Sequence, residues 1–170
     1  MTNESNSLIK NDYFLQPGFI FLPAKATDIS AVLGSCVSVC IYDKKRKTGG
    51  MNHFQFPFIY EKHNATARYG NVATYALINM LANEGSKTKH LEAQIFGGAY
   101  NPEISPKDIG KDNVRIAKSI LTKKQVRIVS EDAGGERGRK IVFNTASGDV
   151  AVLKVERIRE EDWYPYRSNR

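Results

Sequence analysis

A cysteine and a histidine that could carry out acyl chemistry together lie in one stretch of the chain, between residues 32 and 56. Cys36 follows Gly34 and Ser35, and His53 ends the segment Gly-Gly-Met-Asn-His. A cysteine thiolate is a strong nucleophile, and a neighbouring imidazole can take the thiol proton and stabilise the thiolate. If the two side chains meet, the pair could attack the carbon of an amide.

The elements that would position this pair are two strands joined by a turn. Apolar residues alternate with Ser38, Cys40 and Tyr42, a pattern typical of a half-buried strand, and the basic run after residue 43 predicts a turn. If the hairpin is tight and Tyr42 faces Lys47, Cys36 lies opposite His53, with Cβ atoms about 4.5–5.5 Å apart. A slip of one residue would turn His53 to the other face, so the pattern permits this pairing without requiring it.

Several further segments accompany the pair in a fixed order. They read LGSCVSVCIYD, GGMNHFQFP, RYG, IFGGA, IGKDNV and DAGGERGRKIVFNTASG. Together they resemble the chemoreceptor glutamine deamidase family, CheD, over about residues 17–155. The resemblance implies a cysteine hydrolase with a Cys-His-Thr triad, in which Cys36 and His53 match the first two positions. Ser30 occupies the third position, so it keeps the hydroxyl but departs from the family's Thr.

The resemblance also implies a substrate, partners and a fold. The substrate would be the side-chain amide of Gln in the cytoplasmic regions of chemoreceptors, converted to Glu without a cofactor. A second partner would be a CheC-type phosphatase, which would use the same surface as the receptor. The implied fold is an α/β layered sandwich of mainly antiparallel sheet, with two principal helices packed outside.

Length and composition are those of one globular domain. The chain has 170 residues, of which 41% are hydrophobic. No apolar run approaches the roughly 20 residues of a membrane helix, and the polar start has no signal-peptide core, so we expect a cytoplasmic protein without membrane insertion. The expected organisation is a disordered tail at 1–12, one deamidase domain at 13–155 and a charged, aromatic tail at 156–170.

Periodicity predicts the remaining elements. Helices are expected from Asn71, as N-cap, to about Asn83 with Gly85 beyond its end, and from Lys111 or Asp112 to about Thr122. Strands are expected at 19–22, 91–96, 125–130, 140–144 and 149–155, with loops at 24–28 and 131–139.

Glycines mark two sites of unusual backbone. Gly34 would allow the chain to bend between Ser30 and Cys36, and the N–H groups of Ser35 and Cys36 are candidates for an oxyanion hole. The Gly97-Gly98 pair predicts that backbone passes close to another segment. The loop from Gly134 to Lys140 lacks the spacing of a P-loop and precedes a strand, so it could shape the cleft, bind the receptor or only make a turn.

Other readings of the same residues are possible. Cys40 is expected in the core, and His63 and His90 at the surface. Cys36, Cys40 and His53 could be zinc ligands, but a structural site needs a fourth ligand at closer spacing, so we expect no metal. The net charge of +7 could suit nucleic acid, although no aromatic interleaving accompanies it. A binding protein that keeps the triad only as a relic is the remaining alternative, and we expect no nucleic-acid partner.

Overall fold

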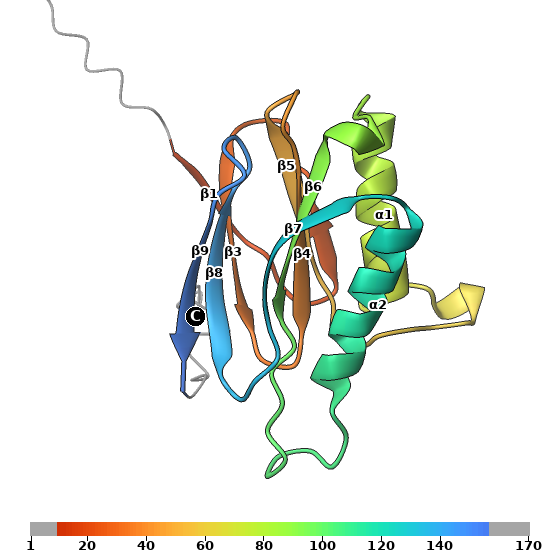
Figure 1. The fold of residues 1–170 in the computed structure, drawn as a ribbon, viewed down its shortest axis with the longest axis vertical. Coiled ribbons are helices and arrows are strands. Elements are labelled where there is room, and N and C mark those ends of the chain that lie inside the picture. Colours follow the sequence, from red (N-terminus) through yellow and green to blue (C-terminus); the bar gives the residue numbers. More distant parts are fainter. Residues whose placement is uncertain (1–9, 157–170) are drawn as a thin grey trace, which may run out of the picture.

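The computed structural model describes residues 10–156, which form three layers: a four-stranded sheet, a five-stranded sheet and a pair of helices (Figure 1). The strands are β1 (Asn11–Phe14), β2 (Phe19–Phe21), β3 (Thr27–Leu33), β4 (Val37–Asp43), β5 (Thr48–His53), β6 (Leu91–Gly97), β7 (Arg127–Ala133), β8 (Gly138–Asn144) and β9 (Val150–Val155). The helices are α1 (Gly70–Asn83) and α2 (Ile109–Lys123), with short 3-10 turns at Lys62–Asn64 and Thr88–His90.

The two sheets lie face to face, and the helices cover the outer face of the larger one (Figure 1). The smaller sheet has the order β1-β3-β8-β9 and the larger one β2-β5-β4-β6-β7. Only the β1/β3 and β6/β7 pairs are parallel among these strands. The predicted layered sandwich, mainly antiparallel with two outer helices, is therefore confirmed.

Strand β4 is the centre of the molecule, and all seven of its residues are buried. Val37, Val39 and Ile41 pack in the cluster beneath the helices, whereas Cys40 and Tyr42 pack between the two sheets. The prediction of a half-buried strand was therefore wrong. Alternate residues of β4 face two different buried environments, and neither face meets solvent. A helix layer covers one face of the strand and the second sheet covers the other.

The helices begin and end close to the predicted residues, with one difference in capping. Gly85, at φ +99°, follows α1 as predicted, and Ser86 N donates to Leu81 O at 3.0 Å, which closes the last turn. The predicted N-cap Asn71 lies inside α1, and its amide instead bonds both backbone groups of Ile59. Asp108 caps α2 by accepting a hydrogen bond from Lys111 N.

Strand ends differ more from the prediction. Residues 11 and 12, assigned to the tail, belong to β1, and residues 27 and 28, assigned to a loop, begin β3. The expected loop at 131–139 is only four residues long, because β7 extends to Ala133 and β8 begins at Gly138. The residues at these strand ends are mostly polar, but they pair with neighbouring strands. The rest of the N-terminal tail and the C-terminal aromatic cluster lie outside the described residues. Within residues 10–156, no helix combines the length and apolar character needed to cross a bilayer.

Gly97 and Gly98 bring three segments together, as the glycine pair predicted. Gly98 N donates to Cys36 O at 2.8 Å, and Gly134 N donates to Gly97 O at 2.9 Å. A Cβ on Gly97 would lie 2.2 Å from Cys36 O, and Gly97 has φ +104°. Only glycine fits both the space and the backbone conformation there.

We expect Gly97→Ala to lower the free energy of unfolding by at least about 2 kcal/mol, because it combines a steric clash with left-handed backbone strain. Gly134→Ala is the matched control, since Gly134 also has positive φ but nothing within 4 Å of its added Cβ. Urea denaturation of both variants measures the difference. Equal losses would show that the contact with the Cys36 segment is not the constraint.

Candidate functional site

Cys36 lies in the short connection by which the chain leaves the smaller sheet, at the end of β3, and enters the larger one at β4. Its side chain is 7% exposed. Three consecutive carbonyls of this connection accept hydrogen bonds from other segments. Gly34 O accepts from Ala99 N at 2.9 Å, Ser35 O from the Asn113 side chain at 2.9 Å, and Cys36 O from Gly98 N at 2.8 Å. The backbone around the sulfur is therefore held from several sides.

Two N–H groups of the same connection, in contrast to its carbonyls, have no hydrogen-bond partner within the described residues. Neither Ser35 N–H nor Cys36 N–H has a hydrogen-bond acceptor among residues 10–156. Cys36 is buried, and buried backbone N–H groups are rarely left without a partner, whereas Ser35 is exposed. Two free donors beside a candidate nucleophile are what an oxyanion hole requires, so both N–H groups stay candidates for that role.

His53 ends β5 and is 1% exposed. Its Nδ1 lies 3.0 Å from the carbonyl oxygen of Leu15. Because a carbonyl only accepts hydrogen bonds, the proton of the neutral ring lies on Nδ1, and Nε2 is left with a lone pair. Nε2 is buried and has no partner within the described chain. The imidazole is thus oriented on one side and free to accept a proton on the other.

The hairpin register differs from the predicted one by two residues. Tyr42 pairs with Gly49 rather than facing Lys47, and Val37 pairs with Phe54. If this register continues one residue beyond the Val37–Phe54 pair, Cys36 lies opposite Gln55. His53, two residues before Gln55, has its side chain on the same face of the hairpin. A shift of two residues preserves the face of a strand, so Cys36 and His53 are diagonal neighbours rather than directly opposed. The turn is longer than assumed because Asp43 Oδ1 accepts hydrogen bonds from the N–H groups of Lys45 and Arg46.

Both members of the pair are neutral at pH 7. Burial raises the pKa of the Cys36 thiol to about 11, partly offset by its own backbone N–H. Burial lowers the pKa of His53 to about 4, partly offset by the bond to Leu15. The site therefore rests as a thiol and an imidazole, not as a thiolate and an imidazolium.

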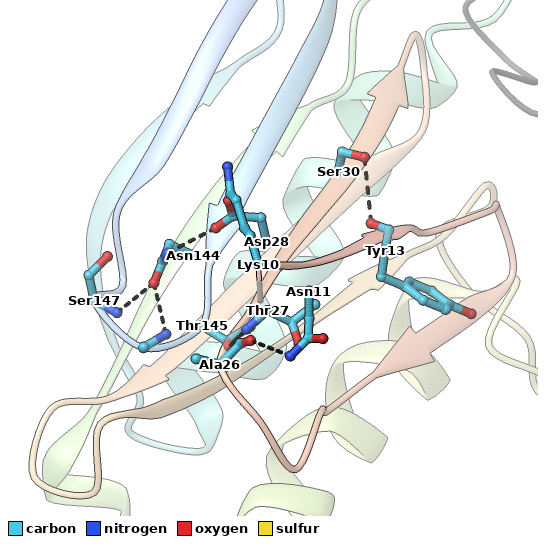
Figure 2. Close-up of polar contacts among 11 residues, drawn as sticks. Lys10, Asn11, Tyr13, Ala26, Thr27, Asp28, Ser30, Asn144, Thr145 and Ser147 are labelled. Carbon is cyan, nitrogen blue, oxygen red and sulfur yellow. Dashed lines mark hydrogen bonds and ion pairs between the residues drawn. The ribbon is translucent and has the colours of Figure 1, made fainter. Parts of the chain in front are cut away.

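Ser30 lies away from this pair. In β3, the inward positions Ile29, Ala31 and Leu33 pack between the sheets, so the side chain of Ser30 points to the other face. Its Oγ lies 3.5 Å from the carbonyl oxygen of Tyr13 on β1 (Figure 2). The expected hydrogen bond between Ser30 Oγ and the His53 ring is not present, because strand alternation separates them.

The main chain of Ser30 does reach the histidine through one residue. Leu15 N donates to Ser30 O at 2.8 Å, and the carbonyl of the same leucine contacts His53 Nδ1. No residue type in the sequence could identify Leu15, since its contribution is a backbone carbonyl. The pairing of the N-terminal segment with β3 thus sets the position of the imidazole.

The loop between β7 and β8 is linked to the Cys36 segment through Gly97, whose carbonyl oxygen accepts a hydrogen bond from Gly134 N at 2.9 Å. Arg139, which is 3% exposed, donates to Asp132 Oδ1, to Gly134 O and to Arg137 O, and so holds the loop closed. Together with Gly98 and the first turns of α2, this loop borders a groove of about 440 Å³. The buried guanidinium is a structural tie. Neither Cys36 nor His53 lines the groove, so among the described residues the loop reaches the candidate site through its contact with Gly97.

The remaining candidate residues lie elsewhere. Cys40 is fully buried between the sheets, as expected, and its burial raises the pKa of its thiol. His63 is exposed, also as expected, and His90 is half-buried. Asn113 was not identified as a functional residue. Its position, between Gly110 and Ala117 on the buried face of α2, is a signal that could have found it.

Comparison with known proteins gives consistent relatives. A family described as CheD chemotactic sensory transduction matches residues 58–154, which begin just beyond His53. Proteins named probable chemoreceptor glutamine deamidase CheD are similar over most of the chain. The one from Trichlorobacter lovleyi is 38% identical over 89% of this chain and 95% of its own length. Those from Sulfurimonas denitrificans and Rhodospirillum rubrum are 35% and 39% identical, over 85% and 84% of this chain and 94% and 82% of their own.

The resting charge state predicts how Cys36 reacts with iodoacetamide. Because the thiolate is the reactive form and the pKa of Cys36 is about 11, the alkylation rate should rise about tenfold per pH unit between pH 7 and pH 10. Mass spectrometry of digested protein should locate the label on Cys36 and not on the buried Cys40. A rate that is already constant at pH 7 would instead indicate a preformed thiolate–imidazolium pair.

Proposed function

Since the chain belongs to the CheD family, we propose that it is a chemoreceptor glutamine deamidase, which hydrolyses the side-chain amide of specific Gln residues to Glu and releases ammonia. The observation that carries this proposal is the buried pair of Cys36 and His53, in which Nε2 has a free lone pair and the thiol is flanked by two free backbone donors. The enzyme is a protein-glutamine glutaminase that acts in chemotaxis.

Acylation begins when His53 Nε2 takes the proton of the Cys36 thiol as the amide enters the site. The thiolate attacks the amide carbon, and the N–H groups of Ser35 and Cys36 donate to the oxygen that becomes negative. His53 then gives its proton to the amide nitrogen, the carbon–nitrogen bond breaks, and ammonia leaves behind a thioester.

Deacylation uses one water molecule. His53 takes a proton from water, the hydroxide attacks the thioester carbon, and the carbon–sulfur bond breaks to release Glu. The sulfur regains the proton and both groups return to their neutral forms. Water is the only co-reactant, so no cofactor enters the balance.

Ser30 acts in this proposal as a positioning residue through its backbone. Its carbonyl holds Leu15 N, and Leu15 O holds Nδ1 of the imidazole. A neutral carbonyl orients the ring in the way that a triad's third member does, but it stabilises the imidazolium less than a carboxylate would. Slow turnover compared with a protease is therefore expected.

The partners follow from the same family relationship. We expect the enzyme to act in the cytoplasm on the cytoplasmic regions of chemoreceptors, and to bind a CheC-type phosphatase on an overlapping surface. Large apolar side chains on the segments that follow His53 and Gly97 support a macromolecular partner, since Tyr60 is 89% exposed and Ile104 is 82% exposed.

The deamidase activity can be tested with a purified cytoplasmic fragment of a chemoreceptor. After incubation with the wild-type chain, mass spectrometry should find a gain of about one mass unit per converted Gln, as NH₂ is replaced by OH. Cys36→Ala should abolish the gain, and Cys40→Ala, the matched control, should retain it. Binding without any mass change, across several receptors, would favour a binding protein with a relic site.

The route by which Ser30 contributes predicts the outcome of removing its hydroxyl. Ser30→Ala keeps the carbonyl that holds Leu15, so kcat for deamidation should fall by less than about fivefold, whereas His53→Ala should lower it at least about 10³-fold. Initial rates of ammonia release measure both. A loss near that of His53→Ala would show that the Ser30 hydroxyl, rather than the Leu15 carbonyl, orients the imidazole during the reaction.

A further inference from the structure

Asn113 is a polar residue with no exposed surface on the buried face of α2, which it shares with Gly110, Ala117 and Leu121. Its Nδ2 donates to two carbonyls, Ser35 O at 2.9 Å and Gln55 O at 3.0 Å. Because both partners only accept, this nitrogen is identified unambiguously. Its Oδ1 is buried and has no partner within residues 10–156.

Packing alone does not account for an asparagine at this position. A buried polar atom without a hydrogen bond costs about 1–3 kcal/mol, and the other buried residues of this helix face are apolar or glycine. The two hydrogen bonds of Nδ2 are therefore what the residue contributes. Both go to the segments that carry the proposed nucleophile and base.

The two carbonyls lie where the hairpin opens. Val37 and Phe54 form the last backbone pair, with hydrogen bonds of 3.0 and 2.9 Å in the two directions. Beyond this pair the chains separate, and the amide of Asn113 bridges Ser35 to Gln55 in place of a further pair. Ser35 precedes Cys36, and Gln55 lies two residues after His53, so one side chain sets the spacing of both segments.

The hydrogen bond from Asn113 to Ser35 O also fixes the direction in which the Cys36 N–H points. A trans peptide is planar, with its C=O and N–H pointing in opposite directions, and no cis peptide occurs in residues 10–156. Because Ser35 O points at α2, the N–H of Cys36 must point away from the helix. That N–H has no acceptor among the described residues, and it lies close enough to its own sulfur to lower the thiol pKa.

We propose that Asn113 is a positioning residue that holds the Ser35–Cys36 peptide so that the Cys36 N–H donates to the oxyanion of the tetrahedral intermediate. This role rests on the proposed deamidase function. It separates two parts of catalysis, because the peptide orientation acts on the stabilisation of the intermediate, whereas burial, which these variants keep, is the larger influence on the pKa of the thiol.

The variants Asn113→Leu, which preserves volume, and Asn113→Ala remove the bridging donor. Either should lower kcat for deamidation by about 10²–10³-fold, the effect of losing one oxyanion donor, with KM within about threefold of wild type. The rate of Cys36 alkylation by iodoacetamide at pH 9 should stay within about twofold of wild type. The control is Asn71→Ala, since Asn71 also ties a loop with its amide, at Ile59, and it should leave kcat unchanged.

Two results with these variants would overturn the proposal. One is a kcat within about threefold of wild type, and the other is a parallel fall of kcat and alkylation rate, which would indicate a general loss of structure. Wild-type turnover in the same assay tests the deamidase function separately, because its absence would contradict that function rather than the role of Asn113.

A crystal structure of the wild-type protein with a receptor peptide whose target Gln carries a side-chain aldehyde tests the donor without any variant. The sulfur should add to the aldehyde, and the resulting oxygen should lie about 3 Å from Cys36 N. An oxygen directed elsewhere would overturn the proposal even if the Asn113 variants do not fold.

Discussion

The crossing of the chain from one sheet to the other, at residues 34–36, is the constraint on which the rest of the structure depends. Three successive carbonyls are fixed there by donors from the segment after β6 and from α2. A loop held in this way has little conformational freedom, so the sulfur and its neighbouring N–H groups are positioned before substrate arrives. Such preorganisation is what makes electrostatic stabilisation effective, because little reorganisation is needed during the reaction. Three glycines are part of the same constraint. A Cβ at Gly97 would meet Cys36 O, and a Cβ at Gly98 or Gly110 would force apart α2 and the segment after β6, which supply these donors.

The second determinant is the dry environment between the sheets. It keeps both Cys36 and His53 neutral, and it leaves the imidazole with one backbone partner, Leu15 O. Charge separation between sulfur and ring is therefore unfavourable in the empty site. In the proposed reaction, it becomes favourable when the thiolate forms a bond to the substrate carbon and the negative charge moves to an oxygen that backbone donors can reach. On the proposed mechanism, the architecture couples proton transfer to substrate attack instead of storing a reactive ion pair.

Much of this architecture could be predicted from sequence patterns, and the failures have definite causes. Alternation identified β4, helical periodicity identified α1 and α2, and Gly85 marked a helix end, because these are local preferences of the backbone. The hairpin register was wrong by two residues because the side chain of Asp43 builds a longer turn. Even so, Cys36 and His53 share a face, because a shift of two residues preserves it.

The third member of the site could not be predicted in the same way. The family resemblance implied Ser30, but its neighbours in β3, Ile29 and Ala31, are the residues that face inward. The backbone carbonyl of Leu15, just beyond β1, contacts the imidazole instead. Contacts made by main-chain atoms leave no trace in residue type. Asn113 is the opposite case, a polar side chain within an apolar helix face, and such a break in periodicity is visible in the sequence once its buried environment is known.

The burial of Cys36 has a consequence for the lifetime of the enzyme. Peroxide and related oxidants attack thiolates, and beyond the sulfenic acid the oxidation of a cysteine is generally irreversible. A cysteine that is 7% exposed and protonated at rest presents little of the oxidisable form. The burial that keeps the thiol protonated therefore also protects the sulfur from oxidation while the site is empty.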